Sequence, residues 1–374
     1  MKEHESNPEF QEARKSEEEL KGMKNKQLRE YYIRQNELLD YFQEVDELLS
    51  ETTGVVAHTL AREGDPLLPI TRESTDKKAA EQKRKDKIAI NVNFIINVFL
   101  LLAKVLVVIL SNSLSLLASA VDSTMDLVSV LIIFFTTRAA GTTDMYNYPA
   151  GKNRMEPLGV VVFSVVMITS FSQILVESIQ RLADRNISFI DLPYVAIGAM
   201  VVTVLVKAVV WLTYRSFEST GIRALSQDAQ NDVVFNIFSL LFPFVGHTIN
   251  WVYLDPLGAL ILSVYIIQEW IGTLWECVRD LVGHRADPIQ HQRIIYLVTR
   301  FSPLVKAVQF CNVYSAGGGL IVEIDVLLPR DISLPKSHDI CESIQYSIES
   351  LEGIQRAYVH ADYNTKNPSG HQVR

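Results

Sequence analysis

Two pairs of aspartates lie inside apolar runs that are long enough to cross a bilayer. Asp122 and Asp126 belong to LSLLASAVDSTMDLVSVLIIFFTTR, and Asp228 and Asp232 belong to ALSQDAQNDVVFNIFSLLF. A spacing of four residues places both members of a pair on one face of a helix. A lone carboxylate at the membrane centre costs roughly 2.5–3.5 kcal/mol on insertion scales. Four of them therefore need compensation, which a bound divalent cation or protons would supply.

The four carboxylates predict a binding site made entirely of oxygen atoms. Two facing helices would offer them to a single ion. Oxygen ligands suit manganese, magnesium or calcium better than zinc or copper, which favour imidazole and thiolate. The alternative is a set of buried ion pairs with Lys104 and Lys207, which lie on apolar stretches. Because two lysines cannot neutralise four aspartates, we favour the metal site.

Two asparagines could add neutral oxygen ligands. Asn97 lies in the first apolar run, and Asn236 lies one helical turn after Asp232. Both side chains could face the same cavity, or they could form hydrogen bonds between helices. They are secondary candidates for the metal site.

The composition fits a membrane domain that is joined to charged ends. The chain has 374 residues, of which 48% are apolar, and its formal net charge is −8. The charged residues concentrate in the terminal regions, so nucleic acid is not an expected partner. The three cysteines form no CxxC pair, which predicts neither a zinc finger nor a disulfide framework.

Six apolar stretches are long enough, or nearly so, to span the hydrocarbon of a bilayer as helices. They cover about 88–110, 114–138, 155–181, 191–214, 224–247 and 250–275. Lysines and arginines are concentrated before the first stretch, after the second, and between the fourth and fifth. Such segments usually lie in the cytosol, so both termini are predicted to be cytosolic.

The pattern divides the chain into four regions. Residues 1–86 are expected to form a largely disordered cytosolic region, in which 28–49 have the spacing of an amphipathic helix. Residues 87–276 form the six-helix transmembrane domain. Residues 277–366 form a cytosolic domain, and residues 367–374 form a tail.

The cytosolic domain alternates helices and strands. The pattern predicts helices at about 288–301 and 335–351 and strands at about 305–314, 319–328 and 354–362. The glycines of the AGGG stretch at 316–319 indicate a hairpin turn, since the stretch matches no phosphate-binding motif. This order of elements is typical of a ferredoxin-like domain. The predicted fold is a membrane all-α six-helix bundle followed by an α+β ferredoxin-like C-terminal domain.

The chain resembles the cation diffusion facilitator family, and within it the manganese-type subgroup. The resemblance covers about residues 85–365 and depends on DSTMD, DAQND and YPAGKNRMEPLG, together with the six spans and the C-terminal domain. Zinc transporters of this family have His at the first ligand position of the fifth span, where this chain has Asp228. The chain departs from the subgroup at Ala229, where many members have His.

This resemblance implies a transporter bundle and not an enzyme. The protein would be a homodimer in the lipid bilayer that exports a divalent cation, most simply Mn²⁺, to an organelle lumen or the exterior in exchange for protons. Asp122, Asp126, Asp228 and Asp232 would bind the transported metal, and no other cofactor is expected. The expected location is an endomembrane, of the vacuole or the Golgi.

The resemblance also marks a second candidate metal site in the C-terminal domain. His338, His360 and Asp362 fall where zinc-type relatives place regulatory metal ligands. The first strand has no matching histidine, and a His-x-Asp pair on a strand surface is more often without a metal.

Other functions are compatible with the same residues. The protein could transport zinc or iron, or it could be a membrane metal sensor that does not transport. A uniporter driven by the metal gradient and the membrane voltage is also compatible. An intramembrane aspartyl protease would need only two catalytic aspartates, and it leaves the two partner aspartates without a role.

Overall fold

The computed structural model describes residues 10, 13–59, 71–111, 114–141, 146–184, 194–217 and 219–367. The chain divides into two compact units. One unit is Ala79–Val282, and the other combines Met1–Lys78 with Gly283–Arg374.

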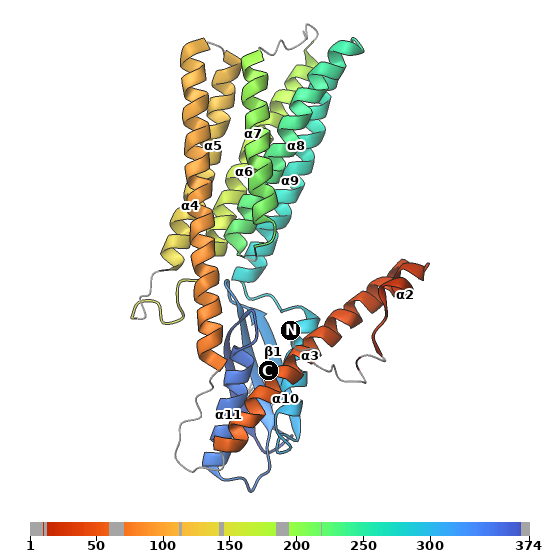
Figure 1. Ribbon diagram of the computed structural model, residues 1–374, viewed down its shortest axis with the longest axis vertical. Helices are drawn as coiled ribbons and strands as arrows, with labels where there is room; N and C mark the ends of the chain where they lie inside the picture. Colours follow the sequence, from red (N-terminus) through yellow and green to blue (C-terminus); the bar gives the residue numbers. More distant parts are fainter. Residues whose placement is uncertain are drawn as a thin grey trace. The chain divides into compact units, whose positions relative to one another are not determined.

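Within the described ranges, the first unit is built from six long helices that run side by side (Figure 1). They are α4 (Thr71–Ser111), α5 (Leu114–Ala140), α6 (Met155–Ala183), α7 (Tyr194–Tyr214), α8 (Thr220–Thr248) and α9 (Leu254–Leu281). Fully buried apolar side chains join these helices, and Phe163 of α6 meets Trp270 of α9 edge to face at 5.0 Å. The predicted six-helix bundle is confirmed.

Five of the described helices contain segments that are long and apolar enough to cross a membrane. These segments are Arg84–Leu106, Ser123–Ala140, Met155–Ala183, Ile197–Tyr214 and Leu254–Leu281. Helix α8 is not among them. Its aspartates and amide side chains, such as Asp228, Asp232 and Asn236, lower its mean hydropathy. The helix that carries Asp228 and Asp232 is thus less apolar than α5, α6, α7 and α9.

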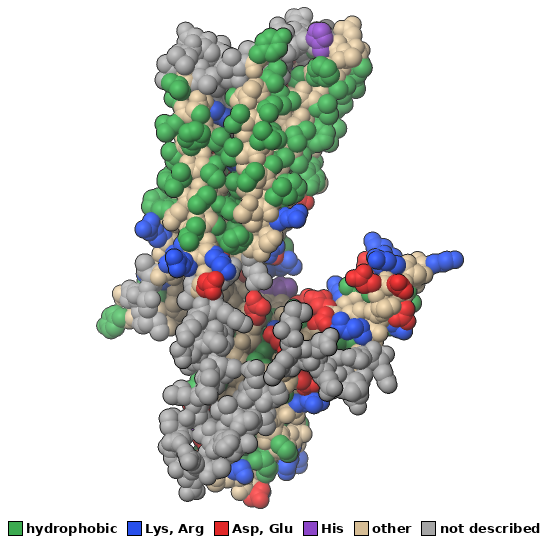
Figure 2. Space-filling model, viewed as in Figure 1, with side chains coloured by type: hydrophobic (Ala, Val, Ile, Leu, Met, Phe, Trp, Pro, Cys, Tyr) green, Lys and Arg blue, Asp and Glu red, His purple; other side chains and the backbone are tan. Residues whose placement is uncertain are grey.

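The outer surface of the bundle is apolar. Figure 2 shows hydrophobic side chains over most of its visible face. Phe99, Leu205 and Phe244, for example, expose 70%, 63% and 72% of their surface. Exposed apolar area on this scale is stable in contact with lipid tails and not with water. The protein is a multi-pass membrane protein.

The second unit contains a three-stranded sheet and two helices that cover it. The strands β1 (Ala307–Ser315), β2 (Leu320–Leu327) and β3 (Ile354–Asp362) lie in the order β1-β2-β3. β1 is antiparallel to β2, and β2 is parallel to β3 through the crossover helix α11 (Leu334–Glu349). Helix α10 (Pro288–Phe301) is capped at its N-terminus by Asp287, whose carboxylate accepts a hydrogen bond from the Ile289 N–H. The predicted α+β fold is confirmed.

Three glycines form the turn between β1 and β2. The φ angles are 72° at Gly317, 148° at Gly318 and 150° at Gly319, and residues that have a side chain rarely adopt such positive values. The Ala316 N–H donates a hydrogen bond to the Gly319 carbonyl, and a Cβ on Gly319 would lie 2.9 Å from Cβ of Gln355. The AGGG stretch is therefore the hairpin turn that the sequence indicates.

The N-terminal region differs from the expected largely disordered segment over residues 17–59. The structure has helices α2 (Glu17–Gly22) and α3 (Lys26–Thr59) there. Val45 and Leu49 of α3 are buried in the same core as the sheet and α10, and Phe42 stacks on Tyr296 at 4.1 Å. Arg293 of α10 is 1% exposed and pairs with Glu44 at 2.7 Å. The sequence shows the amphipathic pattern of α3. It does not show that α10 provides the surface against which the apolar face of α3 is buried.

Candidate metal centre

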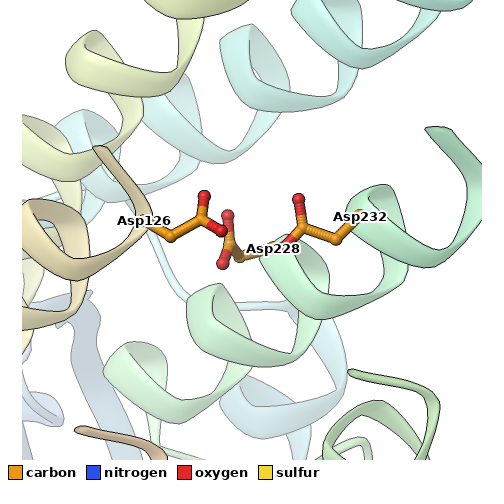
Figure 3. Close-up of side chains that lie close together, drawn as sticks. All are labelled: Asp126, Asp228 and Asp232. Carbon is orange, nitrogen blue, oxygen red and sulfur yellow. The ribbon is translucent and has the colours of Figure 1, made fainter. Parts of the chain in front are cut away.

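Three of the four predicted aspartates come together between α5 and α8. Asp126 of α5 and Asp228 and Asp232 of α8 are buried, and one carboxylate oxygen from each lies within 4.8 Å of the others. Figure 3 shows the three side chains converging on one point. Oxygens on opposite sides of a hard divalent cation, each about 2.0–2.6 Å from it, are about 4–5 Å apart. The three oxygens are therefore close enough to bind one ion.

The fourth predicted ligand, Asp122, lies on α5 one turn before Asp126. Its side chain is outside the described residues. Its role in binding metal stays a prediction that depends on the helical spacing alone.

A lysine that the sequence interpretation left out of the site lies inside the cluster. Lys207 of α7 has a side chain that is only 2% exposed. Its Nζ atom is 3.3 Å from Oδ2 of Asp228 and 3.5 Å from Oδ2 of Asp126, and it also contacts Oδ2 of Asp232. The ion pairing that the sequence offered as an alternative is thus present for Lys207. One ammonium offsets only one of the three carboxylate charges, so the cluster keeps excess negative charge.

One signal in the sequence favours a position for this lysine inside the functional site. Lys207 is the single charged residue in the apolar helix YVAIGAMVVTVLVKAVVWLTY. A charged residue inside a membrane span usually faces the bundle interior and marks a functional pathway.

Contacts from α6 and α9 hold α8 in place. Glu156, in the first turn of α6, accepts hydrogen bonds from the Ser219 hydroxyl at 2.6 Å and the Gly221 N–H at 3.0 Å. It therefore caps the N-terminus of α8 from a different helix. The Thr273 hydroxyl of α9 donates to Oε1 of Gln227 at 2.7 Å. These contacts fix the helix that presents Asp228 and Asp232.

A glycine allows the helix that carries Asp126 to approach α6 closely. A Cβ on Gly159 of α6 would lie 2.1 Å from Oγ1 of Thr136 of α5. Only a glycine fits at this crossing, so the YPAGKNRMEPLG motif supplies both the α5–α6 contact and the cap of α8.

The two candidate asparagines form hydrogen bonds within their own helices. The Asn97 Nδ2 group donates to the carbonyl of Asn93 at 2.9 Å, and the Asn236 Nδ2 group donates to the carbonyl of Asp232 at 2.7 Å. Their amide nitrogens are thus engaged, which leaves the carbonyl oxygen of each side chain as the atom to consider for an ion. Their ligand role stays a prediction.

The candidate residues of the C-terminal domain do not form a three-ligand cluster with one another. His338 is exposed on α11, whereas His360 of β3 pairs with Asp325 at 3.4 Å. Asp362 accepts hydrogen bonds from the Asn364 N–H and the Asn367 side chain, which lower the pKa of its carboxyl. Asp362 thus stabilises the turn after β3. Among the described residues, the aspartates of the membrane unit are the one group of three metal-binding side chains that come together.

Comparisons with known proteins agree with these two units. Residues 90–282 match the family model "Cation efflux transmembrane domain", and residues 286–363 match "Cation efflux protein, cytoplasmic domain", which bears the short name ZT_dimer. The chain is similar to "Metal tolerance protein 11" of Arabidopsis thaliana, with 35% identity over 345 residues that cover 91% of this chain and 83% of that protein. It is also similar to "Metal tolerance protein 5" of Oryza sativa subsp. japonica, with 35% identity over 349 residues, which are 92% of this chain and 79% of that protein.

Proposed function

The chain belongs to the cation efflux family of membrane transporters, and from this premise we propose that it exchanges cytosolic Mn²⁺ for protons from an organelle lumen or the exterior. The family consists of cation transporters and not of enzymes. The identity of the metal, the coupling to protons and the membrane, for which we favour the vacuole or the Golgi, are parts of the proposal.

The observation that carries the proposal is the buried cluster of Asp126, Asp228 and Asp232. These ligands are all carboxylates, and the cluster includes no His or Cys among the described residues. Hard cations such as Mn²⁺ prefer such ligands, whereas Zn²⁺ gains more from imidazole and thiolate. Iron and zinc are the alternative cargoes, and a non-transporting metal sensor is the alternative function.

The proposed orientation in the membrane is supported by the basic side chains at one end of the bundle (Figure 2). The exposed residues at this end include Arg84, Lys87, Arg138, Arg215 and Arg223. Lysines and arginines favour the cytosolic side of a membrane. We therefore place this end, and both termini of the chain, in the cytosol.

A homodimer is the proposed assembly. The match of residues 286–363 to a domain named for dimerisation supports it. The proposed partners are thus a second copy of the chain, the lipid bilayer, and protons as counter-ions.

Metal flux in proteoliposomes tests the proposal. The purified full-length protein is reconstituted around a fluorescent metal indicator, and Mn²⁺, Fe²⁺, Zn²⁺ or Ca²⁺ is added outside. We expect saturable Mn²⁺ influx that is faster than Zn²⁺ influx, and none in vesicles without protein. A sensor would bind Mn²⁺ without any flux, and this result would contradict the proposal.

The first ligand on α8 should determine the metal preference. Replacing Asp228 by His introduces an imidazole into the carboxylate cluster, which favours zinc. We expect the ratio of Zn²⁺ flux to Mn²⁺ flux to rise by about tenfold or more in competition assays, since about 1.4 kcal/mol of ligand preference gives a factor of ten. The matched control is Asp255→His in the first turn of α9, which should leave the ratio unchanged. An unchanged ratio in Asp228→His would show that this position does not set the preference.

A further inference from the structure

Among the described residues, Lys207 is a side chain that contacts the aspartate cluster and to which the proposed function gives no role. It reaches the cluster from α7, whereas the carboxylates come from α5 and α8. Its Nζ atom lies within 3.5 Å of the carboxylates of both Asp126 and Asp228 and contacts Asp232 as well. The buried ammonium thus links three helices at one point.

The ammonium and a divalent ion need the same oxygen atoms. All three contacts of Lys207 are to Oδ2 atoms, so these atoms converge on Nζ. An ion bound to the same oxygens would lie about 2.0–2.6 Å from each of them, in the space that Nζ occupies. Two positive charges so close together in a low-dielectric interior would also repel each other strongly. Each of the two cations therefore excludes the other.

We propose that Lys207 is a built-in competitor of the transported cation, which must leave the carboxylates before the ion binds and returns to them when the ion is released. The inference depends on the proposed function, because it assumes that the aspartates bind the cargo. It assigns Lys207 a specificity and positioning role: the lysine weakens metal binding enough to permit release. When metal binds, Lys207 leaves the carboxylates, and the link between α7 and the helices α5 and α8 is broken.

Two other roles for Lys207 predict different results. If the ammonium stayed beside the ion to balance charge, its removal would weaken metal binding. If it served only to hold the helices together, its removal would lower the stability of the protein with and without metal. A competitor has a third signature: its removal destabilises the metal-free protein and strengthens metal binding, because the ammonium no longer competes with the ion for the carboxylate oxygens.

The test compares wild type with Lys207→Met in full-length protein in lipid nanodiscs. Met has a similar length and no charge. We expect the Kd for Mn²⁺ to fall at least tenfold, the melting temperature in EDTA to fall, and the rise in melting temperature on adding Mn²⁺ to exceed that of wild type. In proteoliposomes, Mn²⁺ influx should slow, since release is no longer assisted. Lys207→Arg keeps the charge and should stay closer to wild type in all four measurements.

A second control lies one turn away on the same helix. Thr203 is buried and donates its hydroxyl hydrogen bond to the carbonyl of Ala199 in its own helix. Thr203→Val changes a buried polar group of α7 without removing charge, and it should leave the Kd for Mn²⁺ unchanged. If Lys207→Met does not yield folded protein, the same comparison is made with Lys207→Gln.

An equal or higher Kd in Lys207→Met would overturn the inference while leaving the proposed function intact. Failure of the proposed function looks different, because the wild-type protein itself would then bind no Mn²⁺ at the aspartates. Tighter binding together with lower stability in EDTA would support the competitor.

Discussion

Replacing Asp232 by Asn should reduce Mn²⁺ transport by about 100-fold or more while leaving the protein folded. Mutating a group that merely supports a metal ligand typically costs 10–100-fold in affinity or activity, so the loss of a ligand should reach or exceed about 100-fold. Asn has nearly the same shape but carries no charge. The remaining carboxylates of Asp126 and Asp228 still pair with Lys207, so the variant leaves no unpaired buried ammonium.

The measurement is Mn²⁺ influx into proteoliposomes, with size-exclusion chromatography and melting temperature as checks of folding. Asp255→Asn is the matched control, because Asp255 is another carboxylate of the membrane unit but lies outside the cluster. It should transport at nearly the wild-type rate. Near-normal flux in Asp232→Asn would remove Asp232 from the site.

Local sequence patterns predicted much of the fold. Helix α10 and strand β3 occupy the predicted residue ranges, because their apolar periodicity and turn residues are local signals. The spacing of the aspartates likewise placed each pair on one helix face. The pairing of α5 with α8 followed from the electrostatics, since four separate buried carboxylates would be too costly.

The contacts that sequence reasoning missed or left open join distant parts of the chain. The ion pairing of Lys207 was offered as an alternative to the metal site, but Lys207 lies on a helix that is apolar on all sides, so the hydrophobic pattern does not show that it reaches all three carboxylates. Glu156 caps a helix that begins more than sixty residues later, and no local rule identifies a cap at that separation. The docking of α3 on α10 involves partners about 250 residues apart, such as Asp46 and Tyr296. In each case the partner is determined by tertiary packing.

Transport of Mn²⁺ into proteoliposomes with an acidic interior should raise the internal pH. When the ion leaves, Lys207 can offset one carboxylate charge, but three carboxylates are present among the described residues. The excess negative charge is costly in a low-dielectric interior, and protons are the cations available to neutralise it. Metal release and proton uptake should therefore occur together.

The experiment follows the internal pH with an entrapped dye while Mn²⁺ enters, with the membrane voltage clamped by potassium and valinomycin. Alkalinisation should track Mn²⁺ influx and should be absent in Asp232→Asn vesicles, which serve as the control for leak. Lowering the external pH should also weaken the apparent affinity for Mn²⁺, because a protonated carboxylate does not ligate metal. Under the clamp, a uniporter would carry Mn²⁺ inward with no change of internal pH. Such a result would remove proton exchange from the mechanism and leave a metal site that is emptied by the metal gradient and by Lys207 alone.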